Sequence, residues 1–115
     1  MNITQRKPFS PGEILVAEFL EPLHITPSQL ADMMKVPRSK INEIINNQQA
    51  ITSDIAIRLG KVFGTSAGVW LNLQMKWDLW HAIHDEKQSV EYESIKRFEF
   101  FYRSQPELGN AFSPR

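Results

Sequence analysis

Apolar residues recur at helical spacing along most of the chain, and the polar segments between them carry residues that start and stop helices. Ser10-Pro11-Gly12-Glu13 has the order of a capping box with proline at the first helical position. It opens a first helix whose apolar residues are Ile14, Leu15, Ala17, Phe19 and Leu20. We expect Pro22 to end that helix, because an internal proline lacks the N–H and clashes with the preceding turn.

The same pattern predicts two short helices next. Thr26-Pro27-Ser28-Gln29 is a second capping box, and the helix that it opens has apolar residues Leu30, Ala31, Met33 and Met34. Pro37 marks the start of the following helix, which is expected to run from Arg38 to about Asn46.

Two longer helices are expected after residue 52. Thr52 or Ser53 caps the first, and Gly64 is its expected C-terminal stop. Its inward residues are predicted to be Ile55, Ile57, Leu59 and Val62. Ser66 caps the second, expected from Ala67 to about His84. Five helices with short connections and no alternating strand pattern indicate an all-α domain.

The chain changes character at Asp85, where it becomes charged and aromatic. A further helix is expected from Ser89 to Arg103, with Val90, Ile95, Phe98 and either Phe101 or Tyr102 on one side. The segment FEFFY is equally typical of a strand. The last ten residues are expected to be loosely ordered. The predicted organisation is one domain over residues 1–84, including the long fifth helix, and a partly ordered C-terminal extension over residues 85–115.

Composition narrows the possible functions. Thirteen Lys and Arg balance thirteen Asp and Glu, so any attraction to nucleic acid must be local. The chain has no cysteine, which excludes disulfides and cysteine-based zinc sites. It also lacks an apolar signal segment and an apolar run long enough to cross a membrane, so a cytoplasmic protein without a membrane partner is expected.

The second and third helices have the spacing of a helix-turn-helix. Such a motif needs a small residue where the helices cross, and Ala31 is at that position. It needs a tight turn, which Val36 closes, and apolar residues that clamp the second helix onto the first, here Ile41 and Ile44. An α-helix presented in this way fits the major groove of DNA.

The opposite face of the Arg38–Asn46 helix is polar and suits base reading. Arg38 can bond the acceptor edge of guanine, Asn42 can pair with adenine, and Glu43 can accept from the cytosine amino group. Ser39 can act as donor or acceptor. The candidates for DNA backbone contacts are Ser28, Gln29, Lys40, Asn46, Asn47 and Gln48. The competing interpretation is an ordinary amphipathic helix whose polar face is merely solvated, or which meets another protein.

Two positions depart from the usual motif. Many such turns carry glycine where Lys35 stands, because that residue takes positive φ. Pro37 occupies a position where Ser or Thr often caps the helix. Only Arg38 and Lys40 are cationic between Pro37 and Thr52. The affinity for DNA is therefore expected to depend on dimerisation and on contacts from uncharged amides, unless cations elsewhere in the chain bind phosphates. Those cations are Arg6, Lys7, Arg58 and Lys61.

Four stretches together resemble the HigA (VapI-like) group of antitoxins within the Xre/Cro/C1 helix-turn-helix class. They are PFSPGEILVAEFLEPL, TPSQLADMMKVPRSKINEIINNQQAIT, AIRLGKVFGTS and WLNLQMKWDLW, between Pro8 and Trp80. The resemblance implies a five-helix, lambda-repressor-like domain that dimerises on a palindromic operator and represses its own operon. It also implies a cognate RelE-like, mRNA-cleaving toxin as partner. Many relatives read NGKR after the recognition helix, whereas this chain reads Asn47-Gln48-Gln49 after Asn46, without the glycine and two cations.

The fifth helix carries a heptad stripe of large apolar residues: Trp70, Leu73, Trp77 and Trp80. A helix that is apolar on several sides needs cover on several sides. The stripe is therefore expected to be buried either in the core or against a second protomer, and a symmetric dimer is what paired half-sites require.

Other candidate sites are weaker. His81 and His84 lie three apart but have no cysteine near them, so surface histidines are expected rather than a metal site. No nucleophile, base and orienting group form a triad, and nothing points to a cofactor. The sequence therefore favours a DNA-binding antitoxin over an enzyme, with a stand-alone Xre-type regulator and a helical protein-interaction module as alternatives.

Overall fold

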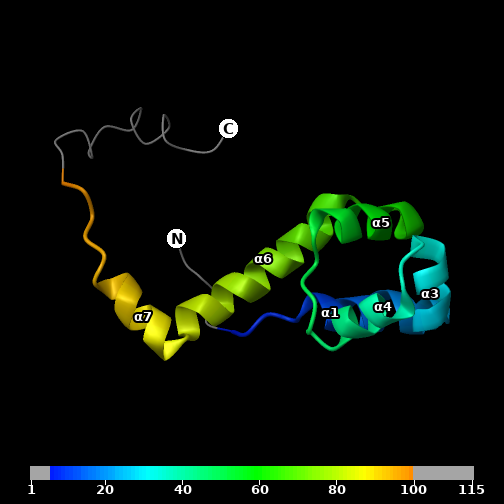
Figure 1. Ribbon diagram of the computed structural model, residues 1–115, viewed down its shortest axis with the longest axis horizontal. Helices are drawn as coiled ribbons and strands as arrows, with labels where there is room; N and C mark the ends of the chain where they lie inside the picture. The colour runs from blue at the N-terminus through cyan, green and yellow to red at the C-terminus, as the bar shows by residue number, and fades with distance from the viewer. Residues whose placement is uncertain (1–5, 100–115) are drawn as a thin grey trace.

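The computed structural model describes residues 6–99, and this part of the chain is helical without a β-strand. Its elements are α1 (Pro11–Ile14), the π-helical η1 (Leu15–Leu20), α2 (Glu21–Leu23), α3 (Pro27–Met34), α4 (Arg38–Ile45), α5 (Ser53–Phe63), α6 (Ala67–His84) and α7 (Glu86–Glu93). The elements from α1 to α5 gather at one end, and α6 runs from them to α7 at the other end (Figure 1). The all-α prediction is confirmed. No helix in the described range is long and apolar enough to cross a membrane.

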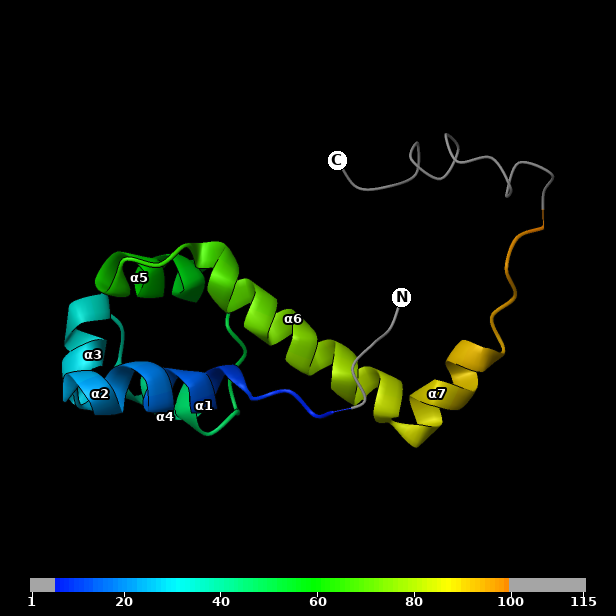
Figure 2. The same ribbon diagram turned by 180° about the vertical axis from the view of Figure 1, so that it is seen from behind.

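The first helix is continuous from α1 through η1 to α2, and it begins at a capping box. The amide of Ser10 donates to Glu13 Oε1 at 2.8 Å, and the amide of Glu13 donates to Ser10 Oγ at 3.1 Å. Leu15 and Leu20 place its inner face in the core. The chain turns back after α2, so that α1 and α4 lie side by side (Figure 2).

The prediction that Pro22 ends the first helix is wrong. Pro22 lies inside α2, and the helix ends at Leu23, followed by His24 as a left-handed cap with a φ of 56°. Before the proline, the amide of Glu21 bonds to the carbonyl of Val16, five residues back, as in a π-helix. This wider turn gives the proline ring room, because the ring would otherwise meet the carbonyl four residues earlier.

The connection between α3 and α4 is a Schellman turn centred on Lys35. The amide of Val36 donates to the Ala31 carbonyl at 3.0 Å, and the amide of Lys35 donates to the Asp32 carbonyl at 3.2 Å. Lys35 itself has a φ of 60°, which is the left-handed conformation that glycine adopts without strain. The expected positive φ at this lysine is thus observed.

We expect Lys35→Gly to stabilise the protein by about 1 kcal/mol, because a side chain in the left-handed region costs about that much. Lys35→Ala removes the same charge but keeps a Cβ atom, so it should leave stability nearly unchanged. Urea unfolding of the three proteins would measure the difference. If Lys35→Ala stabilised the protein as much as Lys35→Gly, the effect would come from the lost charge and not from the backbone conformation.

The core lies between the first helix, α3, α4, α5 and the start of α6. Trp70 is fully buried there, and its Nε1 donates to Thr65 Oγ1 at 2.9 Å. Its ring lies 5.2 Å from that of Phe19, which in turn lies 4.6 Å from Phe63. Large apolar side chains from helices far apart in sequence therefore fix the start of α6 on the domain.

The predicted boundaries of α5 and α6 are largely confirmed. Thr52 and Ser66 cap the two helices, and Gly64 ends α5 with a φ of 74°. The expectation that Ile57 points inward is wrong, since 53% of its surface is exposed. Ile55 and Leu59 are one helical turn apart and buried, whereas Ile57 lies about 200° around the helix from Ile55.

The extension differs from the prediction. Its helix, α7, is Glu86–Glu93, whereas we expected a helix from Ser89 to Arg103. It begins earlier because the side chain of Asp85 caps it, accepting from the amide of Gln88 at 3.0 Å. Residues 95–99 have no regular structure, and the expected apolar side is not buried. The remaining expectations for this region, from Phe100 onward, lie outside the described residues.

Candidate nucleic-acid interface

One face of α4 is polar and open to solvent. The side chains exposed on it are Arg38, Ser39, Asn42 and Asn46, with Glu43 half-buried at its edge. On the opposite side of α4, Ile41 is fully buried and Ile44 is 2% exposed. Ala31 of α3, which belongs to the same core, is also 2% exposed. The structure thus brings the predicted base-reading residues onto one face of a helix that the core holds in place. Lys40 is half-buried on the flank of this face.

The start of α3 offers further polar groups. Ser28 and Gln29 are both exposed in its first turn. The side-chain oxygen of Gln29 accepts from the amide of Thr26 at 2.9 Å, and Thr26 Oγ1 accepts from the amide of Gln29 at 3.1 Å. This reciprocal capping leaves the amide nitrogen of the Gln29 side chain as its remaining donor.

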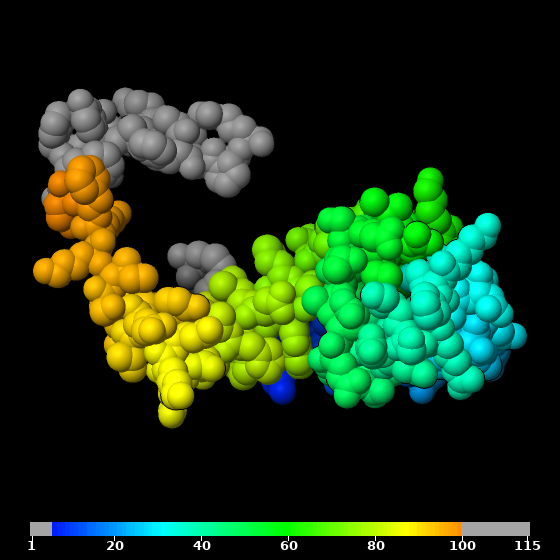
Figure 3. Space-filling view, viewed as in Figure 1, coloured from blue at the N-terminus to red at the C-terminus, as the bar shows by residue number. Residues whose placement is uncertain are grey.

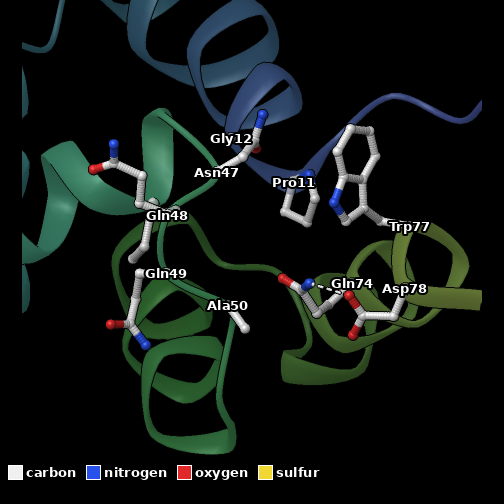
Figure 4. A pocket seen from close by; sticks show the side chains of 10 residues that line it. Pro11, Gly12, Asn47, Gln48, Gln49, Ala50, Gln74, Trp77 and Asp78 are labelled. Atoms are coloured by element: carbon white, nitrogen blue, oxygen red, sulfur yellow. Dashed lines mark hydrogen bonds between the residues drawn. The ribbon is translucent and has the colours of Figure 1, made fainter. Parts of the chain in front are cut away.

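The loop after α4 is also a Schellman turn, and it lies beside α6. Asn47 takes a φ of 61°, and the amide of Gln48 donates to the Glu43 carbonyl at 2.7 Å. Asn47 and Gln48 line a polar groove of about 180 Å³ whose other walls come from the start of α1 and from α6 (Figure 4). These two candidates for backbone contacts therefore lie beyond the polar face of α4, between α4 and α6.

Arg58 has a structural position that the sequence analysis missed. Its Nη1 donates to the Met34 carbonyl at the end of α3 at 2.8 Å, and its Nε lies 3.0 Å from Asp54 Oδ2. The spacing of four residues between Asp54 and Arg58 was the available signal. A cation held in this way ties α5 to the helix-turn-helix.

The stripe Trp70, Leu73, Trp77 and Trp80 faces the protein's own N-terminal half. Trp70 is in the core, and the other three are half-buried. Lys7 Nζ lies 5.2 Å from the ring of Trp77 and 6.0 Å from that of Trp80, in cation–π geometry. The segment before α1 thus covers part of this stripe.

A second apolar stripe on α6 points away from the first, and we call it the free α6 stripe: Leu71, Met75, Leu79 and Ala82. Leu71 is 37% exposed, Met75 54% and Leu79 41%. With Ile51, these residues line an open hollow of about 490 Å³. The side chains of α6 between the core and α7 lie at the surface in the space-filling view (Figure 3).

The short α3, the left-handed turn and the solvent-facing α4 define a helix-turn-helix protein. A family profile described as helix-turn-helix matches residues 16–70, which include all of these elements. The chain is 40% identical over 96 residues to the HTH-type transcriptional regulator YbaQ of Escherichia coli K12, covering 84% of this chain and 85% of that protein.

Two further comparisons involve HigA proteins. The chain is 42% identical over 80 residues to antitoxin HigA-1 of Vibrio cholerae, which is 70% of this chain and 75% of the antitoxin. A solved structure of Pseudomonas aeruginosa antitoxin HigA with the higBA promoter superposes with a TM-score of 0.72 at 40% identity, over 80% of this chain and 99% of that one. The chain belongs to the HigA (VapI-like) family of Xre-type helix-turn-helix antitoxins. This is a family of DNA-binding regulators and not of enzymes.

Proposed function

We propose that this protein is an operator-binding antitoxin that represses its own operon and holds an mRNA-cleaving, RelE-like toxin inactive. The observation that carries the proposal is the exposed polar face of α4 on a buried helix-turn-helix clamp, in a fold shared with an antitoxin solved with its promoter. The DNA-binding domain is residues 1–84, and the protein acts in the cytoplasm, where its operator lies.

In this proposal α4 lies in the major groove. Arg38 bonds guanine, Asn42 adenine and Glu43 cytosine, while Ser39 bonds a neighbouring base edge. The backbone contacts come from Ser28, Gln29, Lys40, Asn46, Asn47 and Gln48. The exposure of Ser28 and Gln29 at the start of α3 supports phosphate binding there, since the first-turn amides of a helix attract anions.

We expect Arg38→Ala and Glu43→Ala to relax operator specificity, each at a different base pair. Each change should cost about 1 to 3 kcal/mol of the free energy of operator binding. Both residues are on the α4 face, so neither change should unfold the domain. Gel shifts against operators varied one base pair at a time would locate the two base pairs. Lys76→Ala on α6 is a control that removes an exposed side chain away from this face. Wild-type specificity in both variants would contradict the base-reading assignment.

The protein is proposed to bind its operator as a homodimer, and the free α6 stripe is its proposed interface. The support is a row of apolar side chains on one side of α6 that the described part of the chain leaves open. Of the two alternatives expected for the tryptophan stripe, burial in the core is observed for Trp70, so the interface is proposed on the opposite side of α6.

A stand-alone regulator without a toxin is the second candidate, favoured by the 40% identity to YbaQ, which is named as a transcriptional regulator. Co-expression with the neighbouring reading frame separates the two. If the proposed function holds, the protein encoded by the neighbouring reading frame inhibits growth when expressed alone, and co-expression with this chain restores growth. The two proteins should also purify as one complex that binds the shared promoter. Promoter binding without a complex would favour the stand-alone regulator, and no salt-dependent DNA binding would favour a protein-interaction module.

A further inference from the structure

An apolar groove runs along the first helix, apart from the base-reading face of α4 and from the free α6 stripe. It consists of two adjoining hollows of about 450 and 570 Å³ that share Val16, Glu21 and Ile45. Val16 and Ile45 are half-buried and form its floor, because both pack against the core. At one end stands Phe9, which is 70% exposed. We call this feature the acidic groove, for the reason given next.

The rim of this groove is negatively charged. Between Pro11 and Leu23 the chain carries Glu13, Glu18 and Glu21 and neither lysine nor arginine. All three glutamates line the first hollow, and among the described residues that line the two hollows none is lysine or arginine. Glu13 is held by its capping bond to the amide of Ser10, whereas Glu18 and Glu21 are exposed three residues apart.

These features decide which kind of partner fits. Carboxylates repel the phosphates of DNA, so the groove is not a second DNA-binding surface. An apolar floor with a rim of one charge suits a protein segment of the opposite charge that also carries apolar side chains. An mRNA-cleaving enzyme presents such segments, because it must attract a polyanionic substrate.

We propose that the acidic groove binds a cationic segment, with one or two apolar side chains, from the RNA-binding face of the cognate toxin. This inference rests on the proposed function. Lysine and arginine side chains of that segment lie against Glu18 and Glu21, and an apolar side chain fills the hollow over Val16 and Ile45. Toxin bound in this way cannot use the same cations for RNA, so the groove competes with the substrate.

Reversing the rim charge tests the proposal. The double variant Glu18→Lys/Glu21→Lys should weaken binding to the purified product of the neighbouring reading frame at least about tenfold, because like charges then face each other. Ala17→Arg, at an exposed position in the groove, should also weaken it by filling the first hollow. The control is Glu91→Lys/Glu93→Lys on α7, which makes the same charge change outside the groove. Affinity would be measured by titration calorimetry, and inhibition by the cleavage of a defined RNA.

The outcomes distinguish this inference from the function on which it rests. Expected are full operator binding by every variant, and loss of both toxin binding and inhibition only in the groove variants. If the wild-type chain binds the toxin and the groove variants bind it equally well, the groove is not the docking site, although the proposed function stands. If the groove variants become monomeric, the groove is a contact between copies, and the inference is wrong. If the wild-type chain does not bind the toxin, the toxin part of the proposed function fails and the inference fails with it.

Discussion

Alanine in place of Gly12 is expected to destabilise the protein by about 3 kcal/mol, which is a large part of the stability of a small domain. A Cβ atom at this position would collide with the carbonyl oxygen of Ile44 and would lie 2.7 Å from that of Ile45. Both neighbours are backbone atoms at the end of α4, so no side chain can rotate away. The first helix and α4 would have to separate, and α4 carries the proposed base-reading face.

Thermal unfolding would measure this effect, with an expected fall in Tm of roughly 10 to 20 °C. Gly68→Ala is the matched control, because the nearest atom to its new Cβ would be Ser66 Oγ at 3.8 Å. Since alanine favours a helix more than glycine does, this variant should be as stable as the wild type or slightly more stable. Equal stability of the two variants would show that the first helix and α4 can shift apart at little cost.

Aspartate at both Met75 and Leu79 is expected to abolish the proposed dimer and to weaken operator binding on the order of 100-fold. The two side chains are 54% and 41% exposed in the centre of the free α6 stripe, where a charge on each protomer would be buried in the proposed interface. Without the interface, the second half-site is no longer bound at the high local concentration that a dimer provides.

Analytical ultracentrifugation and gel shifts on the same preparations would measure the two effects. Because added aspartates repel DNA by themselves, the control is Val90→Asp on α7, where the side chain is 68% exposed and lies beyond the break at Asp85. It should remain dimeric and bind the operator nearly as tightly as the wild type. A dimeric Met75→Asp/Leu79→Asp protein would place the interface elsewhere.

The starts of the first helix, α3, α4, α5 and α6 were predictable from the sequence because each depends on residues close together in the chain, whereas the start of α7 was missed although Asp85 caps it in the same local way. The capping boxes at Ser10 and Thr26, and the caps at Thr52 and Ser66, use a side chain and an amide three residues apart. The positive φ at Lys35 was predictable for a related reason, since the tight turn between two packed helices leaves one residue in the left-handed region.

Features that depend on tertiary contacts were harder to predict. Pro22 is tolerated because η1 widens the turn before it, and no local signal announced that widening. The periodicity of the tryptophan stripe predicts a shared helix face, but it does not predict what covers that face. The position of Lys7 over Trp77 and Trp80 is a contact between segments far apart in the sequence. Glu18 and Glu21 lie near each other in the sequence, but nothing local indicates that the half-buried Ile45 of α4 and an apolar hollow lie beside them.

One contact would link the proposed base reading to the proposed pairing of two protomers. Gln74 of α6 accepts from the amide of Ile51, in the loop that follows the recognition helix, at 2.8 Å. Gln74 is next to Met75 in the proposed interface, so in the proposed dimer α6 would tie α4 to the position of the second protomer. In the proposed dimer, α6 would set the distance between the two recognition helices, which must match about one turn of the double helix, roughly 34 Å. The protein would then discriminate operators by the spacing of their half-sites, which the length of α6 would set, as well as by the bases that α4 reads.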